Sequence, residues 1–522
     1  MKEKKPAAKK KPAAIKQKKR KFYLTTAIAY TNGPPHMGHT YQFTVADTIA
    51  RWHRMKGEDV LFLTGTDEYG MKLKKTAEKL GKTPEELTNE NTEKFKELDK
   101  LMNISFNIFN RTTDKQVHWP TAQKVWMLLS KSGDIYKKKY SGLYCYGCES
   151  FKTERELVNG LCPEHQKAPE LVEEENYFFS LTKYTKKIEE LIVKNEIQII
   201  PETRKLEVLN MLNEMGDVSF SRPTSSLKWG IPVSGDSSQV IYVWCDALTN
   251  YLSGIGYASE PKKFRKYWPA DLHAIGKDIL KFHSIFWPAM LLSAKLPLPK
   301  KIFVHGFVTS GGQKMSKSIG NVVDPFEMIK LYGAESLRYF LLREIPSGED
   351  GDFTEEAFMQ RINSDLADNL GNLVNRILVL TEKYSGGVVP KTDKKSFLAE
   401  KSEEIIKKVN EYLEEFKFHH ALESIFSLSS DANRYINETE PWKITVKEEL
   451  NEVLYNTLET IRIISVLLYP FMPQTAERIS EQIGVDKDFS EKMLQWGLLK
   501  AGTRTKRGDV LFRKVMKVNL GE

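Results

Sequence analysis

Two short segments carry side chains suited to holding a polyphosphate. His36 and His39 flank Gly38 at the point where a Pro-rich turn meets a helical pattern. Histidines three positions apart share one face of a helix, and the first turn of a helix attracts anions. Gly38 leaves room for a ligand to approach the backbone. The histidines are therefore candidates to donate hydrogen bonds to phosphate oxygens, although two nearby histidines alone are more often ordinary polar residues.

The second segment is a glycine-led basic loop. Gly311 and Gly312 precede Lys314 and Lys317 in the string GGQKMSKS. Ammonium groups on a mobile loop suit a pyrophosphate leaving group, whose charge must be neutralised during the reaction. For this segment alone, a solvated surface loop is the default interpretation.

A third group has the spacing of a metal site. Cys145 and Cys148 form one Cys-x-x-Cys pair, and Cys162 and His165 form a Cys-x-x-His pair after thirteen intervening residues. Two such pairs close a four-ligand tetrahedron around Zn²⁺, and four protein ligands predict a structural ion. Unrelated thiols are the weaker alternative. The chain has only four cysteines, which favours a reducing cytosol over a disulfide framework.

Alternating strand and helix patterns predict how the phosphate-binding segments are positioned. Residues 22–30 and 60–64 have the apolar and β-branched composition of buried strands, with a turn and a helix from His36 between them. This βαβ unit predicts a parallel, Rossmann-like sheet. The sheet pattern is interrupted over 117–220, and we expect it to resume in three stretches. These stretches are Val240–Trp244, Leu272–Ile275 and Ile302–Val308.

The last third of the chain has a different pattern. Long amphipathic segments predict a helical bundle, namely Asn363–Tyr384, Glu400–Phe416, His420–Asn437 and Leu450–Tyr469. We therefore expect an α/β protein in which a zinc-binding insertion splits the catalytic domain and an all-α domain follows. The expected divisions are a basic tail (1–21), the first catalytic half (22–116), the insertion (117–220, with its knuckle at about 140–170), the second catalytic half (221–330), a linker (331–362) and the helical domain (363–522).

Charge and hydropathy exclude some classes of protein. The net charge is +9, but residues 1–21 carry eleven Lys or Arg and one Glu, which leaves the remainder near −1. The Lys/Pro/Ala tail is expected to be disordered. Its role is either solubilising or, as the sharper alternative, binding nucleic-acid phosphates. The sequence has neither a secretory signal nor an apolar run long enough to span a membrane, so we expect a cytoplasmic protein.

The two phosphate-binding segments together resemble the HxGH and KMSKS motifs of class I aminoacyl-tRNA synthetases. Met37 stands where that class more often has Ile or Leu. Four further stretches are similar to methionyl-tRNA synthetases of the one-zinc-knuckle type, and the resemblance extends over the chain from about residue 22. The stretches are AIAYTNG at 27–33, LTGTDE at 63–68, YVWCDALTNY at 242–251 and GKDILKFH at 276–283. The chain departs from the family's frequent TDEHG in having Tyr69.

The resemblance implies ATP-dependent activation of L-methionine and its transfer to the 3′-terminal adenosine of tRNA(Met). His36, His39, Lys314 and Lys317 would be the catalytic residues, with Mg²⁺ accompanying ATP. Asp278 would hold the ribose, and His305 and Val308 the adenine. Gly38 completes the ATP site.

The resemblance also implies a methionine pocket. Because a thioether offers little to hydrogen bonding, recognition depends on shape and sulfur–aromatic contact. Asp67 would bind the substrate ammonium. Arg222 matches a family position beside the amino-acid site, where its guanidinium would pair with Asp67. Plain core packing is the alternative for the aromatic residues. The other expected pocket residues are Ala27, Ile28, Tyr30, Trp244, Ala247, Leu248, Tyr251, Phe282, His283 and Trp287.

In the helical domain, Asn372, Arg376 and Trp442 match positions that read the CAU anticodon in the family. Surface polar residues and a packing tryptophan are the alternative. A further tRNA-binding, dimerising domain is not visible after the bundle, so we expect a monomer. Two rival functions stay open: a synthetase for leucine, valine or cysteine, and a tRNA-binding protein without catalysis. The segment 117–220 is too short for the large editing insertion of the branched-chain enzymes.

Overall fold

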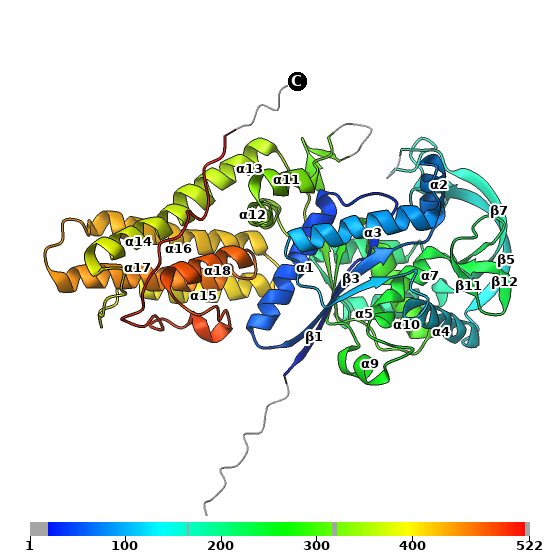
Figure 1. Cartoon of the computed structure of the whole chain (residues 1–522). Helices are drawn as coiled ribbons and strands as arrows, with labels where there is room; N and C mark the ends of the chain where they lie inside the picture. The colour runs from blue at the N-terminus through cyan, green and yellow to red at the C-terminus, as the bar shows by residue number, and fades with distance from the viewer. Residues whose placement is uncertain (1–18, 164–165, 316–320, 517–522) are drawn as a thin grey trace, which may run out of the picture.

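A computed structural model describes residues 19–163, 166–315 and 321–516. It has two lobes, an α/β lobe and a helical lobe, joined side by side (Figure 1). The cysteine-containing insertion lies at the far end of the α/β lobe, away from the helical lobe. The expected fold class, a Rossmann-like sheet followed by a helical bundle, is confirmed.

The α/β lobe is organised around one sheet in which every pairing is parallel. Its strands run in the order β4, β3, β1, β13, β14, β8, and β2 also pairs with β3. Leu24 in β1 faces Phe62 in β3 and Leu272 in β13, and all three side chains are buried. The strands are β1 (Lys21–Thr26), β2 (Ala29–Tyr30), β3 (Asp59–Asp67), β4 (Ile108–Arg111), β8 (Gln198–Ile200), β13 (Leu272–Gly276) and β14 (Lys301–His305).

Helices cover this sheet because its strands are apolar on both faces. Helix α1 crosses β1, β3 and β13, and its buried residues include Phe43, Val45 and Ile49. Helix α3 begins with a capping box in which Thr83 and Glu86 satisfy each other's backbone N–H groups. The helices of this lobe are α1 (Met37–Met55), α2 (Met71–Lys79), α3 (Pro84–Leu101), α4 (His118–Lys131), α5 (Thr185–Val193), α6 (Glu202–Leu212), α7 (Val243–Leu248), α8 (Asn250–Ser253), α9 (Pro261–Tyr267), η3 (Lys277–Ile279), η4 (Phe282–Phe286) and α10 (Trp287–Ser293).

The sheet differs from the sequence prediction in three places. β8 lies inside the expected insertion 117–220, yet it pairs with β14 at the sheet edge. β8 has only three residues, which are too few for a strand pattern to be recognised in the sequence. The stretch Val240–Trp244 is not a strand of this sheet, because β12 ends at Ile241 and α7 begins at Val243. The predicted strand Ile302–Val308 is divided between β14 and β15.

The expected basic tail is also shorter than 1–21, since Lys21 opens β1 and its ammonium pairs with Asp271 at 2.8 Å. Residues 1–18 lie outside the described part of the chain.

Besides the main sheet, the described residues form three small sheets, of which one lies in the insertion. β5 forms a long ladder with β7, and β6 and β9 complete that sheet in the order β6, β5, β7, β9. Outside the insertion, a second antiparallel sheet has the order β10, β12, β11. A third sheet near the basic loop has the order β16, β15, β17, in which β15 pairs with β16 in antiparallel and with β17 in parallel. The bounds are β5 (Ile135–Cys145), β6 (Ser150–Lys152), η1 (Glu154–Glu156), β7 (Glu170–Phe179), η2 (Leu181–Lys183), β9 (Val218–Ser219), β10 (Ser221–Pro223), β11 (Ile231–Val233), β12 (Asp236–Ile241), β15 (Val308–Ser310), β16 (Gln313–Lys314) and β17 (Gly351–Asp352).

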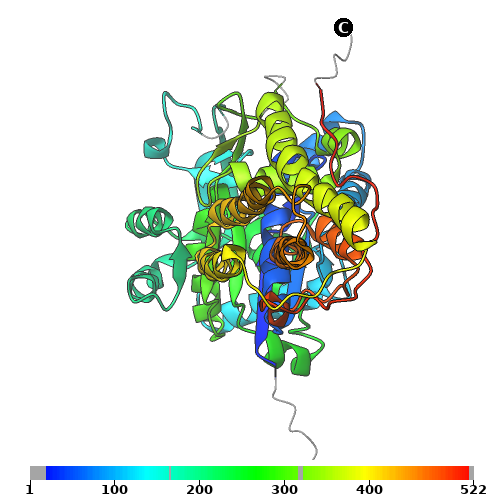
Figure 2. The ribbon, with the colours of Figure 1, turned by 90° about the vertical axis from the view of Figure 1, so that its left-hand side faces the viewer.

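The helical lobe confirms all four predicted amphipathic segments. Its long helices run alongside one another, and a view along the lobe shows them end-on around a common core (Figure 2). Leu373, Leu422 and Leu458, from three different helices, are completely buried. The elements are α11 (Pro325–Tyr332), α12 (Ala334–Glu344), α13 (Glu355–Arg361), η5 (Ile362–Gly371), α14 (Asn372–Ser385), α15 (Phe397–Glu414), α16 (Phe418–Thr439), α17 (Lys447–Leu468), α18 (Pro473–Ile483) and η6 (Glu491–Leu494).

Arg338 of α12 joins the two lobes through a buried charge cluster. Its guanidinium contacts Asp47 of α1 at 2.7 Å and donates to the carbonyls of Met102, Pro470 and Phe471. Asp47 also pairs with Arg51 at 2.7 Å. A fully paired buried arginine of this kind fixes the relative position of the elements that it touches.

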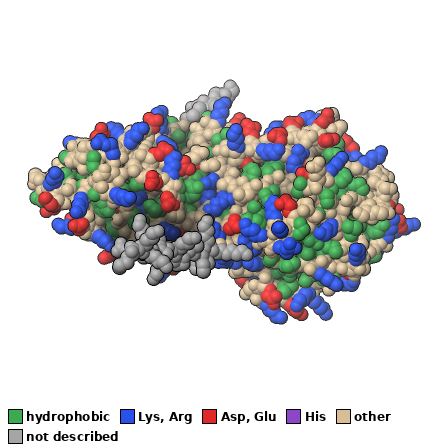
Figure 3. All heavy atoms as spheres, turned by 60° about the horizontal axis from the view of Figure 1, so that its bottom comes forward, with side chains coloured by type: hydrophobic (Ala, Val, Ile, Leu, Met, Phe, Trp, Pro, Cys, Tyr) green, Lys and Arg blue, Asp and Glu red, His purple; other side chains and the backbone are tan. Residues whose placement is uncertain are grey.

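The surface carries charges of both signs. In a space-filling view, Lys and Arg side chains alternate with Asp and Glu over both lobes (Figure 3). This matches a body whose net charge is close to zero outside the basic tail. Among the described residues, no helix combines the length and the apolar character needed to cross a bilayer.

Candidate functional site

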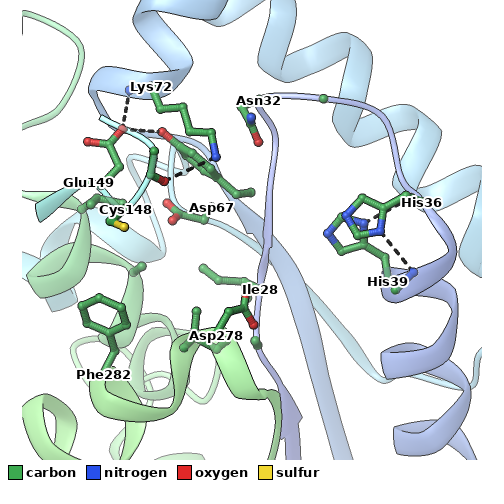
Figure 4. A pocket seen from close by; sticks show the side chains of 18 of the residues that line it. Ile28, Asn32, His36, His39, Asp67, Lys72, Cys148, Glu149, Asp278 and Phe282 are labelled. Atoms are coloured by element: carbon green, nitrogen blue, oxygen red, sulfur yellow. Dashed lines mark hydrogen bonds between the residues drawn. The ribbon is translucent and has the colours of Figure 1, made fainter. Parts of the chain in front are cut away.

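A cavity of about 720 Å³ opens at the carboxyl ends of β1, β3 and β13. This is the edge at which open α/β sheets bind ligands. His36 and His39 lie at one end of it, Glu149 and Lys72 at the other, and Asp67 between them (Figure 4). Fifteen of the predicted ATP and methionine residues line the cavity, namely Ala27, Ile28, Tyr30, His36, Gly38, His39, Asp67, Trp244, Ala247, Leu248, Tyr251, Asp278, Phe282, His283 and Val308.

The histidine end of the cavity is the start of α1. Nδ1 of His36 accepts from the Gly38 N–H at 3.1 Å, and Nδ1 of His39 accepts from the His36 N–H at 3.3 Å. Since each Nδ1 is an acceptor, a neutral ring carries its hydrogen on Nε2. Burial and the neighbouring His36 and His305 hold the pKa of His39 well below its usual value. His39 is therefore a neutral Nε2–H donor at this end of the cavity.

Gly38, which lines the cavity, is also next to the ring of His36. The imidazole of His36 caps the helix, and a Cβ on Gly38 would lie 3.0 Å from that ring. The two imidazoles stack with centroids 3.8 Å apart. Glycine at this position thus makes room for the capping histidine.

Asp67 is a buried carboxylate at the end of β3. It is 7% exposed, and its Oδ1 has no hydrogen-bond partner among the residues that the structure describes. Burial and then the charge of Asp246 raise its pKa well above the usual value. A buried carboxylate oxygen without a donor is unfavourable, so this position suits a cationic group of a ligand.

Aromatic rings form the opposite wall. Trp244 and Phe282 stack with centroids 3.3 Å apart. Tyr251 and His283 are joined by a hydrogen bond of 2.7 Å between the hydroxyl and Nε2, and Nδ1 of His283 donates to the Ile279 carbonyl at 3.1 Å. A carbonyl oxygen can only accept, so the single N–H of the neutral imidazole is on Nδ1. Nε2 therefore accepts from the Tyr251 hydroxyl. Burial accordingly lowers the pKa of His283 to about 4.

Three predicted placements differ from the structure. Trp287 is completely buried behind Tyr251, with ring centroids 6.0 Å apart, and it supports the wall instead of lining the cavity. His305 is buried beneath the cavity and its Nδ1 bonds to the Gly306 carbonyl. Arg222 does not pair with Asp67: its carboxylate partner is Glu174 at 3.9 Å, and its guanidinium covers the Tyr242 ring at 3.7 Å. Sequence spacing cannot distinguish a cavity wall from the layer behind it.

The basic loop comes to the same cavity. Met315 and Val322, which precede and follow the undescribed stretch, both line it, as does Phe307. Lys314 is the last residue of β16, and its side chain is not described. Lys317 lies outside the described residues. The two segments that the sequence analysis paired therefore meet at one site although nearly three hundred residues separate them.

Three thiols of the predicted metal site converge. The sulfur atoms of Cys145, Cys148 and Cys162 all lie within 4.8 Å of one another, and those of Cys148 and Cys162 are 3.5 Å apart. Tetrahedral Zn–S bonds of about 2.3 Å place sulfurs about 3.8 Å apart. The three thiols thus fit a zinc ion. His165, the fourth predicted ligand, lies outside the described residues.

The three predicted anticodon residues lie on the helical lobe. Asn372 is exposed at the start of α14, and Arg376 one turn later donates to Asn437 of α16 at 2.7 Å. Trp442 follows α16 and is 47% exposed, an unusual position for a large aromatic side chain.

Glu149 and Lys72 are among the polar residues of the cavity that were not predicted from the sequence. Glu149 comes from the Cys148–Ser150 turn of the insertion, and Lys72 from the first turn of α2. The spacing of the cysteines signals a metal site but not the burial of the glutamate between them. Only the docking of the insertion against β2 and α2 brings these residues to the cavity.

Comparison with known proteins gives consistent matches over almost the whole chain. Residues 22–170 and 165–378 match the family of class I tRNA synthetases (M). Residues 385–521 match the anticodon-binding domain of methionyl-tRNA ligase.

The similar proteins include methionine–tRNA ligases from several bacteria. That of Caldanaerobacter subterraneus subsp. tengcongensis is 46% identical over 508 residues, which cover 95% of this chain and 79% of that protein. That of Brucella suis is 42% identical, with 90% and 92% covered. A solved structure of Mycobacterium tuberculosis methionyl-tRNA synthetase in complex with methionyl-adenylate superposes with a TM-score of 0.91 at 40% identity, covering 94% of this chain and 99% of that one.

Proposed function

Since the chain belongs to the methionyl-tRNA synthetase family and is a methionine–tRNA ligase, we propose that the cavity at the sheet edge is where methionine and ATP react. The observation that carries the proposal is the arrangement along this cavity. Donor histidines occupy one end and an aromatic wall the side. Between them is a carboxylate with one oxygen that has no partner among the described residues. The ligand bound in the similar M. tuberculosis enzyme, methionyl-adenylate, contains the groups that these three regions would bind.

Methionine would bind between Asp67 and the aromatic wall. Its ammonium would satisfy Oδ1 of Asp67, and its thioether would contact Trp244, Phe282 and Tyr251. Sulfur–aromatic contacts contribute about 0.3–1.5 kcal/mol. The length of the bound amino-acid side chain would be limited by Ala27, Ile28, Ala247 and Leu248. An apolar pocket of this kind discriminates between side chains that differ by one methylene by about 1–3 kcal/mol.

ATP would extend from Asp278 to the start of α1. The carboxylate of methionine attacks the α-phosphorus, and pyrophosphate leaves. Nε2–H groups of His36 and His39 would donate to phosphate oxygens as their charge increases. Lys314 and Lys317 would neutralise the pyrophosphate, together with the Mg²⁺ that accompanies ATP. A ribose hydroxyl of the terminal tRNA adenosine then attacks the activated carbonyl, so a protein nucleophile is not required.

Outside the cavity, Asn372, Arg376 and Trp442 would read the CAU anticodon. Unpaired bases are recognised by stacking on aromatic and guanidinium groups and by hydrogen bonds to their edges, and these side chains supply both. Cys145, Cys148, Cys162 and His165 would hold one structural Zn²⁺. We further propose a cytoplasmic monomer, which light scattering of the purified chain would test.

The decisive experiment is amino-acid-dependent ATP–pyrophosphate exchange with methionine, leucine and cysteine in parallel. Methionine alone should support exchange at low concentration, and charging of a tRNA with a CAU anticodon should follow. Equal exchange with leucine would contradict the proposed pocket. Binding of the tRNA without exchange would favour a non-catalytic tRNA-binding protein.

The first prediction concerns the basic loop. Lys317→Ala should lower kcat for exchange about 10²- to 10³-fold, the usual effect of losing one group that stabilises transition-state charge. Methionine binding, measured by equilibrium dialysis, should change little. Lys330→Ala, an exposed lysine of α11, is the matched control and should leave kcat unchanged. An unaltered kcat in Lys317→Ala would remove that residue from the mechanism.

A further inference from the structure

Glu149 is the only carboxylate that the metal-binding segment contributes to the cavity wall, among the residues that the structure describes. It lies directly between Cys148 and Ser150, with a backbone φ of 52°, in the left-handed region. Its side chain is 4% exposed, so the turn of the cysteine cluster inserts a carboxylate into the catalytic lobe.

Four donors surround this carboxylate. Oε1 accepts from the Tyr30 hydroxyl at 2.9 Å and from the backbone N–H of Lys72. Oε2 accepts from the hydroxyls of Tyr144 at 2.8 Å and Tyr242 at 2.6 Å. A buried carboxylate is costly unless donors compensate for the lost water, and here each oxygen has two. Such a set of charge-assisted bonds fixes the side chain in one position.

The same contacts fix Tyr30, which lines the proposed methionine site. Its hydroxyl donates to Glu149 and accepts from the Leu73 N–H at 3.1 Å. Gly70 leaves the space that these two groups fill, since a Cβ there would lie 2.5 Å from the Tyr30 oxygen and 2.9 Å from Oε1 of Glu149. The position of the Tyr30 hydroxyl therefore depends on its hydrogen bond to Glu149.

We propose that Glu149 is a positioning residue through which the cysteine cluster holds Tyr30 in place for methionine, so that metal occupancy and methionine affinity depend on each other. This inference rests on the proposed function of the cavity. The geometry provides the connection: Cys148 is a proposed ligand, Glu149 is its neighbour in the chain, and Tyr30 is one hydrogen bond away. Because coupling between two binding sites is reciprocal, methionine should also retain the metal.

Glu149→Ala and Glu149→Gln separate positioning from folding. The alanine variant leaves the Tyr30 hydroxyl without its acceptor, and the KM for methionine should rise at least about 10-fold, the effect of losing one hydrogen bond to a charged group. The KM for ATP and kcat should stay within about 3-fold of the wild type. In Glu149→Gln the carbonyl oxygen can still accept from Tyr30 and Lys72, so the KM for methionine should return to within about 3-fold.

Glu156→Ala is the matched control in the same insertion. Glu156 caps the short η1 turn and lies outside the cavity wall, so none of these parameters should change. An unchanged methionine KM in Glu149→Ala would overturn the proposal. A parallel rise in the KM values for methionine and ATP would also overturn it, since that pattern indicates general distortion.

The second measurement does not depend on catalysis. A chromogenic chelator would follow the release of Zn²⁺ from the loaded protein with and without saturating methionine. In the wild type, methionine should slow release at least about 3-fold, and this protection should disappear in Glu149→Ala and persist in Glu149→Gln. Equal protection in all three proteins would refute the coupling.

Tyr30→Phe distinguishes failure of this inference from failure of the proposed function. If Tyr30→Phe raises the KM for methionine and Glu149→Ala does not, the cavity binds methionine but Glu149 does not position it. If neither change alters the KM, the pocket assignment itself is wrong. If Glu149→Ala fails to fold, Tyr30→Phe tests the same coupling, because it removes the same hydrogen bond from the other side. Protection of Zn²⁺ by methionine that persists undiminished in Tyr30→Phe would refute the coupling.

Discussion

At the scale of single residues, the site is defined by groups whose hydrogen-bonding capacity the protein leaves incomplete or fixes in one direction. Asp67 illustrates the first case and His283 the second. Both side chains are buried, and burial favours the neutral form of each. It raises the pKa of the Asp67 carboxyl and lowers the pKa of the His283 imidazole. A cationic group of a ligand beside Asp67 offsets part of the free energy that is lost when its carboxylate is buried.

Replacing Asp67 with Asn should therefore weaken methionine binding specifically. Loss of one buried charge-assisted bond costs about 1.5–3 kcal/mol, so the KM for methionine in ATP–pyrophosphate exchange should rise at least 10-fold, while the KM for ATP changes little. Asp99→Asn is the control, since Asp99 of α3 is also a buried carboxylate that lacks hydrogen-bond partners within the described part of the chain, and it lies away from the cavity. Similar methionine KM values in the two variants would argue against the ammonium role.

His283 gives the stability of the protein a dependence on pH. Its folded pKa of about 4 lies below the unfolded value of 6.5, so the unfolded state binds more protons below about pH 6.5. Acidification from pH 7 to pH 5 should remove about 2 kcal/mol of stability through this residue alone. In urea titrations at the two pH values, His283→Gln should reduce the difference in unfolding free energy by about that amount. Replacing the exposed His420 with Gln should not.

At the scale of elements, the carboxyl ends of β1, β3 and β13 lie around the cavity. Close packing between the strands keeps these ends in place. Gly65 in β3 shows how close this packing is. A Cβ on Gly65 would lie 1.8 Å from the Asn110 carbonyl oxygen in β4. The Asn110 carbonyl is part of the backbone of β4, so it cannot move aside as the end of a flexible side chain could.

Gly65→Ala should accordingly destabilise the protein by about 3 kcal/mol, the upper range for overpacking. Gly216→Ala provides the comparison, because nothing lies within 4 Å of its Cβ and its φ is not in the left-handed region. That change should stay within about 0.5 kcal/mol. Thermal unfolding of both variants checks the difference, and an equal shift in Tm would mean that β4 moves aside at little cost.

Elements were predictable where the pattern was long. The strands β1, β3 and β13 and four of the bundle helices follow from strand composition or helical periodicity over many residues. β8 spans three residues, and β12 has a strand's composition but joins a different sheet. Which strands pair is decided by contacts far apart in the chain. The same holds for the site: motifs indicated His36, His39 and Asp67, whereas Glu149 became visible only once the insertion was placed.

At the scale of the whole molecule, the relation between the lobes depends on a few buried polar contacts. Arg338 connects α1, the end of α3 and the segment before α18. Without Arg338, Asp47 would keep only Arg51 as an ion-pair partner among the described residues, and three backbone carbonyls would lose this donor. Breaking a buried ion pair of this kind costs about 3–5 kcal/mol. The anticodon residues and the cavity lie in different lobes, so their relative placement depends on this junction.

Arg338→Met should lower the unfolding free energy by about that amount and separate the unfolding of the two lobes. Differential scanning calorimetry should show two resolved transitions where the wild type shows more cooperative unfolding. Arg265→Met, at an exposed position on α9, should leave the profile unchanged. A single transition with an unchanged Tm in Arg338→Met would show that apolar packing alone holds the lobes together.

The pairing of β1 with β13 has a consequence for synthesis of the chain. Thr25 lies beside His273, which is 248 residues further along. At translation rates of about 5–20 residues per second, β1 leaves the ribosome roughly 12–50 seconds before its neighbour exists. During that interval the backbone N–H and C=O groups along one edge of β1 have no strand to pair with in the nascent polypeptide. Early association with chaperones is therefore expected for the amino-terminal hundred residues, until the ribosome has released the strands that complete the sheet.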